Sequence, residues 1–504
     1  MSSTTTGAEA ADAVSPAGTE GLSWPPLIAL SLGYFLVMLD VTVVTVAVPA
    51  IRDSVGASAS AMAWVVDGYS SVFGGLLLMG GGFGDRLGHR KVFLSGLGVF
   101  ALASIGCALA TTPATLVASR LAQGAGGALL VPTSLALLTA SYPVPAVRAK
   151  ALGIWAGISG IAFAAGPLVG GLLVAGLSWR AAFWINVPIA LLAVWLTRRN
   201  VPSPTGRAGA RGLDPVGQVL GIVAVMGLAA ALNEASTKGW TSPVVLGAGA
   251  LALLALVLFV LAERRMEARG IETQPPLLPL SLFRSPGFSS TAAVGVLLNL
   301  GYYGMLYLST LYLQNERGYD ALGAGLALLP TVCMAVVAAP LSGRLTARYG
   351  PYVPMTGALL LGSVGFVGWL LAGSDTPYWA LLPALIATGL ATPSTVPAAT
   401  AAIVQAAPAQ NAGVASAVFN VARQVGNSLG VALFASLIAG RGDLVSGLRI
   451  SALIASAAFF VAALLALSSW RNAKARAGAG QTFIGAGNFI ALNSAHAAGV
   501  DDRQ

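Results

Sequence analysis

The sequence has little charge, cysteine or histidine, and each shortage excludes a class of protein. Asp, Glu, Lys and Arg make up 9% of the 504 residues, against about 25% in an ordinary soluble domain, which excludes a water-soluble enzyme. Two cysteines and two histidines are present, at spacings that fit neither a disulfide framework nor a metal site. No Walker lysine motif is present, which argues against ATP as the energy source.

Apolar residues dominate, at 56% of the chain, and the mean hydropathy is +0.80. They fall into blocks of about twenty residues, long enough for a helix to cross the ~30 Å hydrocarbon layer of a bilayer. The sequence therefore predicts an all-α polytopic membrane protein. The net charge of +9 comes from basic residues scattered at the ends of these blocks, which indicates membrane topology and no nucleic-acid partner. The fourteen predicted spans are 24–48, 62–83, 92–112, 115–139, 150–175, 181–197, 214–233, 242–262, 288–313, 321–341, 352–372, 378–402, 412–438 and 450–470.

An even number of spans puts both termini on one side of the membrane. Most of the 27 Lys and Arg residues then fall in segments on the side of the termini, which predicts that both termini are cytoplasmic. Residues 1–23 contain no Lys or Arg and are expected to form a disordered cytoplasmic tail, not a signal peptide. Residues 471–504 are expected to form a second cytoplasmic tail, disordered by default.

A weak internal repeat relates two loops of the chain. Gly81–Gly88 and Gly343–Gly350 share the pattern Gly-x-(Leu/Phe)-x-(Asp/Ala)-Arg-x-Gly, at an offset of 262 residues. Two related six-helix halves joined in this way are typical of one class of transporter, whose site lies between the halves. The expected domains are an N-terminal bundle over 24–197, a linker with two inserted helices over 198–287, and a C-terminal bundle over 288–470.

Four motifs occur in order along the chain, at Leu39–Pro49, Gly81–Lys91, Arg120–Gly127 and Gly160–Gly171. Over residues 24–470 the chain resembles the major facilitator superfamily, specifically its fourteen-helix drug:proton antiporter family of multidrug and antibiotic resistance exporters. The resemblance implies a major facilitator fold of two six-helix bundles plus two inserted helices. It also implies proton-coupled export of a drug-like or antibiotic small molecule across the cytoplasmic membrane by alternating access, without a cofactor.

Three ionisable residues are predicted inside the first bundle, where an ionised group is costly. Asp40, Asp67 and Arg120 are expected about 12, 8 and 8 Å from the outer ends of their spans, at about 1.5 Å per residue. A carboxylate beside an arginine stays ionised, and exchange of that partner for a proton or a cationic substrate would couple the two movements. The alternatives are a static salt bridge for Asp40 with Arg120, and simple solvation near a helix end for Asp67.

Two glycine-containing motifs are assigned conformational roles by the resemblance. The loop after the second span is expected to form a tight turn and a cytoplasmic gate, in which the carboxylate contacts the start of the thirteenth span. The motif in the fifth span is expected to form an antiporter hinge and a proton seal between the halves. Ordinary turn and packing roles remain the alternatives. The gate residues are Gly81, Asp85, Arg86, Gly88 and Arg90, and the hinge residues are Gly166, Pro167, Gly170 and Gly171.

Aromatic and polar side chains inside the spans are the expected contacts for a planar, amphipathic substrate. Arg423 has no acidic partner in its own half and is expected to contact backbone carbonyls, a substrate anion or Asp85. Spans nine to fourteen contain no Asp or Glu, which counts against transport of divalent cations. The predicted substrate cavity comprises Tyr34, Gln123, Trp155, Tyr302, Tyr303 and Arg423.

Two other functions remain open from the sequence. An exporter or symporter of a physiological metabolite would use the same fold, although the glycine–proline motif of the fifth span favours antiport. A membrane sensor or scaffold without transport activity would not need ionisable residues inside its spans.

Overall fold

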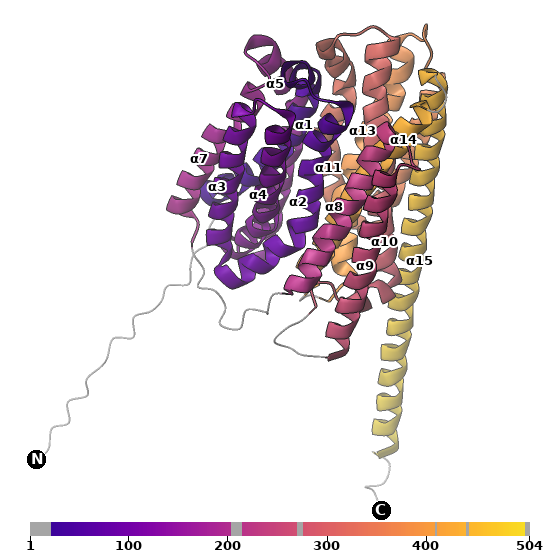
Figure 1. Cartoon of the computed structure of the whole chain (residues 1–504). Coiled ribbons are helices and arrows are strands. Elements are labelled where there is room, and N and C mark those ends of the chain that lie inside the picture. The colour runs from indigo at the N-terminus through magenta and orange to yellow at the C-terminus, as the bar shows by residue number, and fades with distance from the viewer. Residues whose placement is uncertain (1–21, 203–213, 270–275, 409–410, 440–442, 499–504) are drawn as a thin grey trace, which may run out of the picture.

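A computed structural model describes residues 22–202, 214–269, 276–408, 411–439 and 443–498. The described residues are almost entirely helical (Figure 1). The first group of helices is α1 (Trp24–Val55), α2 (Ala59–Leu87), α3 (His89–Leu109), α4 (Pro113–Ser141), α5 (Pro145–Gly176), α6 (Ala181–Trp184) and α7 (Asn186–Asn200). An inserted pair, α8 (Pro215–Lys238) and α9 (Pro243–Arg269), follows. The remaining elements are η1 (Leu280–Arg284), α10 (Pro286–Leu311), η2 (Tyr312–Glu316), α11 (Ala321–Tyr349), α12 (Tyr352–Val367), η3 (Gly368–Leu371), α13 (Tyr378–Gln405), α14 (Ala412–Ala439) and α15 (Leu444–Ala498).

Each of the fourteen predicted spans coincides with a helix, or with α6 and α7 together for the sixth. Within the described residues, twelve helices are long and apolar enough to cross a membrane by length and composition. Helix starts follow local capping chemistry: Thr112 and Thr115 form a capping box on α4, and Asp320 accepts the Gly323 N–H at 2.7 Å on α11. Hydrogen bonds from the side chain and backbone of Ser446 lower the pKa of Asp443, which precedes α15.

Several helices run further than predicted, and in three of them the extension changes an expectation. Helix α1 continues through Pro49 to Val55 and ends at Gly56, whose φ of 60° suits a residue without a side chain. Helix α2 continues through most of the predicted turn, which is confined to Gly88 with φ 95°. The expectation of a disordered second tail is wrong for 471–498, which continue α15 because the segment is rich in alanine, a strong helix former.

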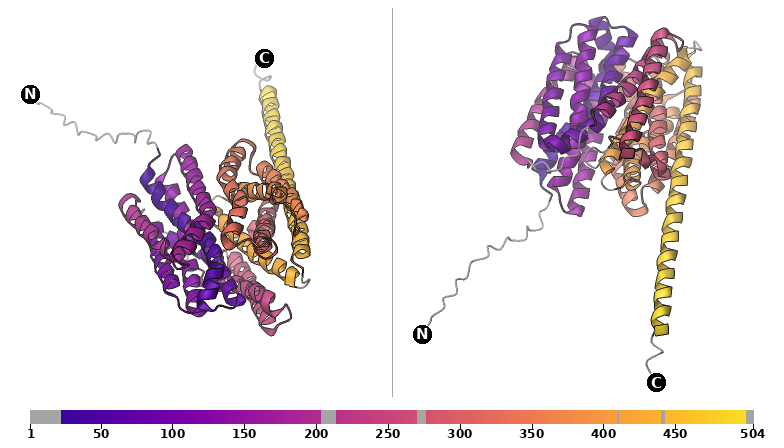
Figure 2. Two further views of the ribbon diagram at one scale, coloured as in Figure 1. Left: turned by 90° about the horizontal axis from the view of Figure 1, so that it is seen from above. Right: turned by 60° about the horizontal axis from the view of Figure 1, so that its bottom comes forward.

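The helices form two groups that meet along their length (Figures 1 and 2). Helix α5 packs on α11, and α2 packs on α14, so these four helices make most of the direct contact between the two groups. Helix α8 packs on both α2 and α14, so the inserted pair bridges the groups on one side. The predicted domain boundaries remain a prediction.

The repeat offset of 262 residues reappears in the helix boundaries. Adding it to the start of α1 gives the start of α10, and adding it to both ends of α2 gives both ends of α11. Contacts repeat as well: Gly124 of α4 lies against the backbone of Tyr69, and Gly389 of α13 lies against the backbone of Thr331. The two groups are therefore copies of one helical arrangement.

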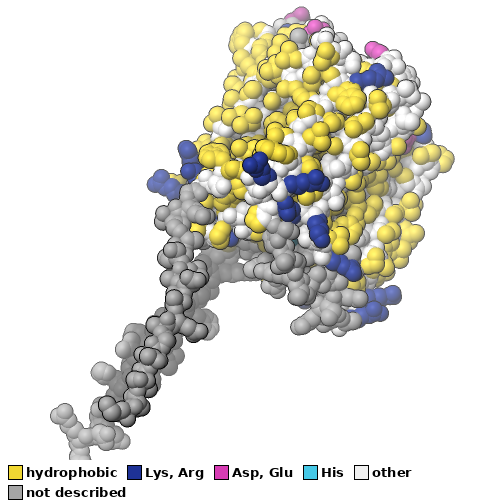
Figure 3. Space-filling model, turned by 90° about the vertical axis from the view of Figure 1, so that its left-hand side faces the viewer, with side chains coloured by type: hydrophobic (Ala, Val, Ile, Leu, Met, Phe, Trp, Pro, Cys, Tyr) yellow, Lys and Arg dark blue, Asp and Glu magenta, His cyan; other side chains and the backbone are white. Residues whose placement is uncertain are grey.

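Apolar side chains cover the flank of the molecule that Figure 3 presents. On that face most visible Lys and Arg side chains lie toward one end, and the visible Asp and Glu side chains lie at the other (Figure 3). Helix α9 exposes leucines around most of its surface, including Leu246, Leu251, Leu253 and Leu254. This surface, together with the apolar helices, defines a multi-pass membrane protein.

Candidate functional site: a buried ion pair and an aromatic group between the helix bundles

An ion pair between Asp40 of α1 and Arg120 of α4 lies at the centre of the first helix group. Arg120 Nη1 donates to Asp40 Oδ2, and each residue is only 1% exposed. Because α1 runs to Val55, Asp40 lies about 22 Å from the end of its helix at about 1.5 Å per residue, deeper than predicted. Water reaches neither residue of the pair in this conformation. The helices must move before a proton from solvent can reach Asp40.

Two amide side chains complete the hydrogen bonding of Asp40. Its Oδ1 accepts from Gln123 Nε2 at 2.8 Å and from Asn186 Nδ2 at 2.9 Å. Gln123 Nε2 also donates to Ser104 Oγ at 2.8 Å, which ties α3 into the cluster. These neutral donors stabilise a carboxylate without adding charge, so the charge balance of the site depends on Arg120.

The guanidinium of Arg120 is held in one plane by several partners. Its Nε donates to the Val65 carbonyl at 2.8 Å, and its Nη1 also donates to Gln123 Oε1 at 2.7 Å. The ring of Tyr69 lies 4.4 Å from the guanidinium carbon, and that of Phe183 lies 5.9 Å from it. Such directional bonding and ring contact suit arginine and do not suit lysine.

Asp67 is not part of this cluster, although the sequence placed it at a similar depth. It is 6% exposed and forms no ion pair or hydrogen bond with any described residue. It lies close enough to Tyr307 of α10, in the second helix group, to interact with it electrostatically. Asp67 is therefore a buried carboxyl group at the contact between the two groups, separate from the Asp40–Arg120 pair.

Three polar residues of these surroundings were not predicted as site residues. Asn186 and Ser104 are short polar side chains in apolar helices. No charged residue lies beside them in the sequence that would have indicated a polar site. Glu234 lies beyond the predicted end of its span, yet it is 8% exposed inside α8, where it accepts from Trp64 Nε1 at 3.3 Å. Glu234 also forms a salt bridge with Lys238 at 3.0 Å. The spacing of four residues between an acid and a base is the feature of the sequence that could have indicated this contact.

The glycines of the fifth span pack within the first helix group. A Cβ on Gly166 would collide with Thr42, and a Cβ on Gly170 would lie 3.0 Å from the Val43 carbonyl. These two glycines let α5 approach α1 beside the turn that carries Asp40, and their expected role as a hinge and a seal between the halves stays a prediction. Gly171 is buried, and the side chain of Pro167 lies outside the described residues.

The predicted gate is described only in part. Gly81 is helical, Arg86 is exposed, and Arg90 Nη2 donates to the Arg198 carbonyl at 2.6 Å, a contact within the first group. The side chain of Asp85 lies outside the described residues, so its contact with the start of α14 stays a prediction.

A second cluster, the interbundle aromatic group, contains Tyr34, Trp155, Tyr303 and Arg423. The rings of Tyr34 and Trp155 stack at 4.4 Å with an interplanar angle of 21°. From the second helix group, Tyr303 lies close enough to interact with both Tyr34 and the guanidinium of Arg423. The indole N–H of Trp155 is buried and has no partner among the described residues. Paired rings, a cation and an unused donor are thus placed where the two groups meet.

Arg423 is held by side-chain amides. It donates to Asn299 Oδ1 at 3.5 Å and to Asn420 Oδ1 at 3.4 Å. The described hydrogen bonds of Arg423 include no backbone carbonyl, and the expected contact with Asp85 stays a prediction because the side chain of Asp85 lies outside the described residues.

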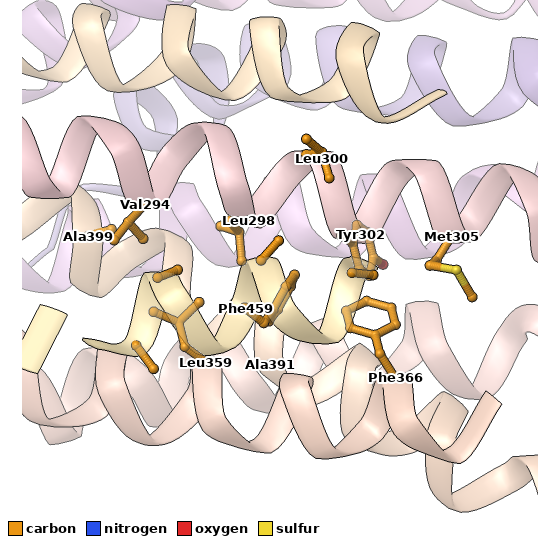
Figure 4. Packing of buried hydrophobic residues seen from close by; sticks show 14 of the residues in the cluster. Val294, Leu298, Leu300, Tyr302, Met305, Leu359, Phe366, Ala391, Ala399 and Phe459 are labelled. Atoms are coloured by element: carbon orange, nitrogen blue, oxygen red, sulfur yellow. The ribbon is translucent and has the colours of Figure 1, made fainter. Parts of the chain in front are cut away.

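Two residues predicted for the cavity lie elsewhere. Gln123 is fully buried in the Asp40–Arg120 cluster. Tyr302 is 4% exposed and packs beside Met305 and Phe366 in the core of the second helix group (Figure 4). Adjacent positions on a helix point about 100° apart, so Tyr303 reaches the contact between the groups while Tyr302 does not.

Gly124→Ala is expected to destabilise the ion-pair cluster. A Cβ at this position would lie 2.5 Å from the Tyr69 carbonyl oxygen, so α4 and α2 would separate, at a cost of about 1–3 kcal/mol. The measurement is the thermal unfolding temperature in detergent. Gly153→Ala in α5 is the control, because nothing lies within 4 Å of its new methyl group. Equal unfolding temperatures for the two variants would contradict the close packing.

Two repeated helix groups in a membrane, with a buried ion pair in one and an aromatic group between them, define a membrane transporter of the alternating-bundle class. The family model for the Major Facilitator Superfamily matches residues 30–216 and 201–431. The chain belongs to the major facilitator superfamily.

Known relatives cover most of the chain. It is 37% identical to the methylenomycin A resistance protein of Streptomyces coelicolor over 93% of this chain and 96% of the relative. It is 36% identical to the tetracenomycin C resistance and export protein of Streptomyces glaucescens, over 84% of this chain and 78% of the relative. Among solved structures, the human organic anion transporter MFSD10 (TETRAN) matches with a TM-score of 0.64 and 16% identity, over 88% of this chain and 99% of that one. The last match concerns the fold alone.

Proposed function

We propose that this protein is a proton-coupled antiporter that exports a drug-like or antibiotic small molecule by alternating access. The observation that carries the proposal is the buried Asp40–Arg120 pair, in a chain similar over most of its length to proteins named for antibiotic resistance and export. A proton gradient supplies the energy, and neither ATP nor a cofactor takes part. The protein lies in the cytoplasmic membrane with both termini in the cytoplasm, as the distribution of Lys and Arg favours.

The chemistry follows from competition for Asp40. With Arg120 in place, Asp40 is ionised and the cluster is closed. When the bundles move and admit water, a proton on Asp40 removes its attraction for Arg120, and the cluster opens. Asp67, buried at the contact between the bundles beside Tyr307, is a second protonation site, and movement of the bundles would expose it to a cationic substrate. Substrate and proton then favour opposite conformations, which is the requirement for antiport.

The test is growth of a host that lacks its own exporters, with and without the gene, in a panel of antibiotics and planar toxic compounds. Raised tolerance to at least one compound, lost on dissipation of the proton gradient, supports the proposal. Normal membrane expression without protection against any compound would favour a metabolite exporter or symporter on the same fold. Absence of any transported solute would favour a sensor or scaffold.

Trp155→Ala is expected to weaken binding of a planar substrate about tenfold, or about 1.4 kcal/mol, since it removes one ring of a stacked pair and a buried donor. Titration calorimetry of substrate binding to the purified protein measures the change. Trp195→Ala is the matched control, because that indole is 55% exposed on the outside of α7. Equal affinities for both variants would remove the interbundle aromatic group from substrate recognition.

A further inference from the structure

Two buried carboxyl groups meet where the inserted helix pair joins the second bundle. Asp214 caps α8, and its Oδ1 accepts the Gly217 N–H at 2.8 Å. Glu263 of α9 accepts the Leu278 N–H through Oε2 at 3.1 Å. Asp214 is 4% exposed and Glu263 is 0% exposed. Each residue therefore uses one oxygen for a backbone N–H and holds the other in a site without solvent.

The two remaining oxygens face each other. Asp214 Oδ2 and Glu263 Oε1 are buried and accept no hydrogen bond from a described donor. Both lie against the same point, because a Cβ on Gly217 would contact each of them, and the two side chains are within hydrogen-bonding reach. Two ionised carboxylates in this arrangement would repel strongly, whereas one proton between them makes a hydrogen bond.

We propose that Asp214 and Glu263 form a proton-binding site that carries one shared proton and fastens the inserted pair to the linker leading into α10. The O–H of one carboxyl donates to the other, and the remaining negative charge lies at the N-terminus of α8, where the helix dipole stabilises it. One turn further along α9, Glu267 accepts the N–H groups of Leu280 and Ser281, each at 3.2 Å. The linker is thus held by two carboxyl groups, of which only Glu263 lies within hydrogen-bonding reach of another acid.

No described cation neutralises the pair. Glu267 is the other acid that acts on Glu263. From α9 and η1, Arg264, Arg265, Arg269 and Arg284 are exposed and form no ion pair with either acid in the described part of the chain. On α2, which packs on α8, Arg86 is exposed and Asp67 lies toward the other end of the helix, while the side chain of Asp85 lies outside those described. On α14, which also packs on α8, Arg423 is held by asparagines. Loss of the proton therefore leaves two adjacent negative charges and loosens the linker, whatever substrate the transporter carries.

Thermal unfolding of the purified full chain between about pH 5 and about pH 8 tests the site. Free carboxyl groups are ionised over this range, so the folded protein binds one proton more than the unfolded chain, and its stability falls as the pH rises. We expect Glu263→Gln to flatten this dependence by about 2 °C per pH unit. Glutamine keeps the acceptor for Leu278 and donates to Asp214, so it mimics the protonated pair without titrating.

Glu267→Gln is the matched control, since it removes one negative charge from the same linker but from a carboxyl that shares no hydrogen bond with another acid. It should keep the pH dependence of the parent protein, and Asp214→Asn should flatten it as Glu263→Gln does. An infrared band of a protonated carboxyl at neutral pH should be present in the parent and reduced in Glu263→Gln. Parallel unfolding curves for the parent and both pair variants, or an unchanged band, would overturn the proposal.

Discussion

Asp40→Asn is expected to abolish substrate-induced proton release from everted membrane vesicles and to reduce drug export to background. Asparagine accepts from Gln123 and Asn186 but cannot neutralise Arg120, which is 1% exposed and then remains as an unpaired buried cation. Breaking a buried pair in this way costs about 3–5 kcal/mol of stability. The variant must therefore be compared with the parent at equal amounts of folded protein in the membrane.

Asp375→Asn provides the control for loss of a carboxylate, because Asp375 lies exposed in the loop between η3 and α13. Its vesicles should release protons as the parent does. Normal coupling in Asp40→Asn would remove Asp40 from the mechanism and leave Asp67 as the candidate proton carrier.

Arg120→Lys is expected to lose most export, nearly as much as Arg120→Ala. The guanidinium bonds Val65, Asp40 and Gln123 in one plane under the ring of Tyr69, and an ammonium group cannot repeat that geometry. In the alanine variant Asp40 has lost its cation in a site without water, which favours its protonated form and locks one conformation. Substrate binding should survive in both variants, weakened mainly for cations.

Transport measured against external pH separates a gating arginine from a structural one. Arg348→Lys is the control, because Arg348 is exposed and its side chain contacts the ring of Tyr349. Both Arg120 variants should lose the pH dependence of transport, and the control should keep it. If the Arg120 variants follow the parent curve, the buried ion pair serves packing alone.

The spans, the repeat and the pairing of Asp40 with Arg120 were predictable because each has a strong local cause. Blocks of apolar residues set helix positions to within a few residues, and a lone cation inside a membrane requires an anion nearby. The depth of Asp40 was underestimated because Pro49 was taken as the end of a helix that tolerates it. Packing against neighbouring helices decides such cases, and a single segment of sequence does not contain that information.

Residues that depend on helix rotation were predicted less well. Tyr302 and Tyr303 are adjacent in sequence, yet one lies in the core of a bundle and the other faces Tyr34 and Arg423. Gln123 is a polar residue inside a span, as a substrate contact would be, but its amide donates a hydrogen bond to Asp40. The face that a uniformly apolar helix turns to each neighbour is set by the tertiary structure, and its hydrophobic pattern gives little guidance.

The repeat also shows which residues of the second bundle occupy the places of the buried ion pair. An offset of 262 residues relates Asp40 to Tyr302, which lines a small cavity with Leu385 and Thr388 of α13. The contact of Gly389 with Thr331 matches that of Gly124 with Tyr69, so Leu385 and Thr388 take the places of Arg120 and Gln123. The second bundle thus holds neutral side chains where the first holds an ion pair, and it can supply substrate contacts without its own buried charge.

The most direct test of the account is proton flux in liposomes that contain only this protein. A compound that the growth panel identifies as a substrate is added to one side, with no imposed proton gradient, and the pH of the enclosed volume is followed with a trapped dye. We predict that the substrate gradient drives protons in the opposite direction in the parent, and that Asp40→Asn liposomes show no pH change. Substrate movement without any proton movement, or equal proton movement in both proteins, would contradict coupling through the Asp40–Arg120 pair.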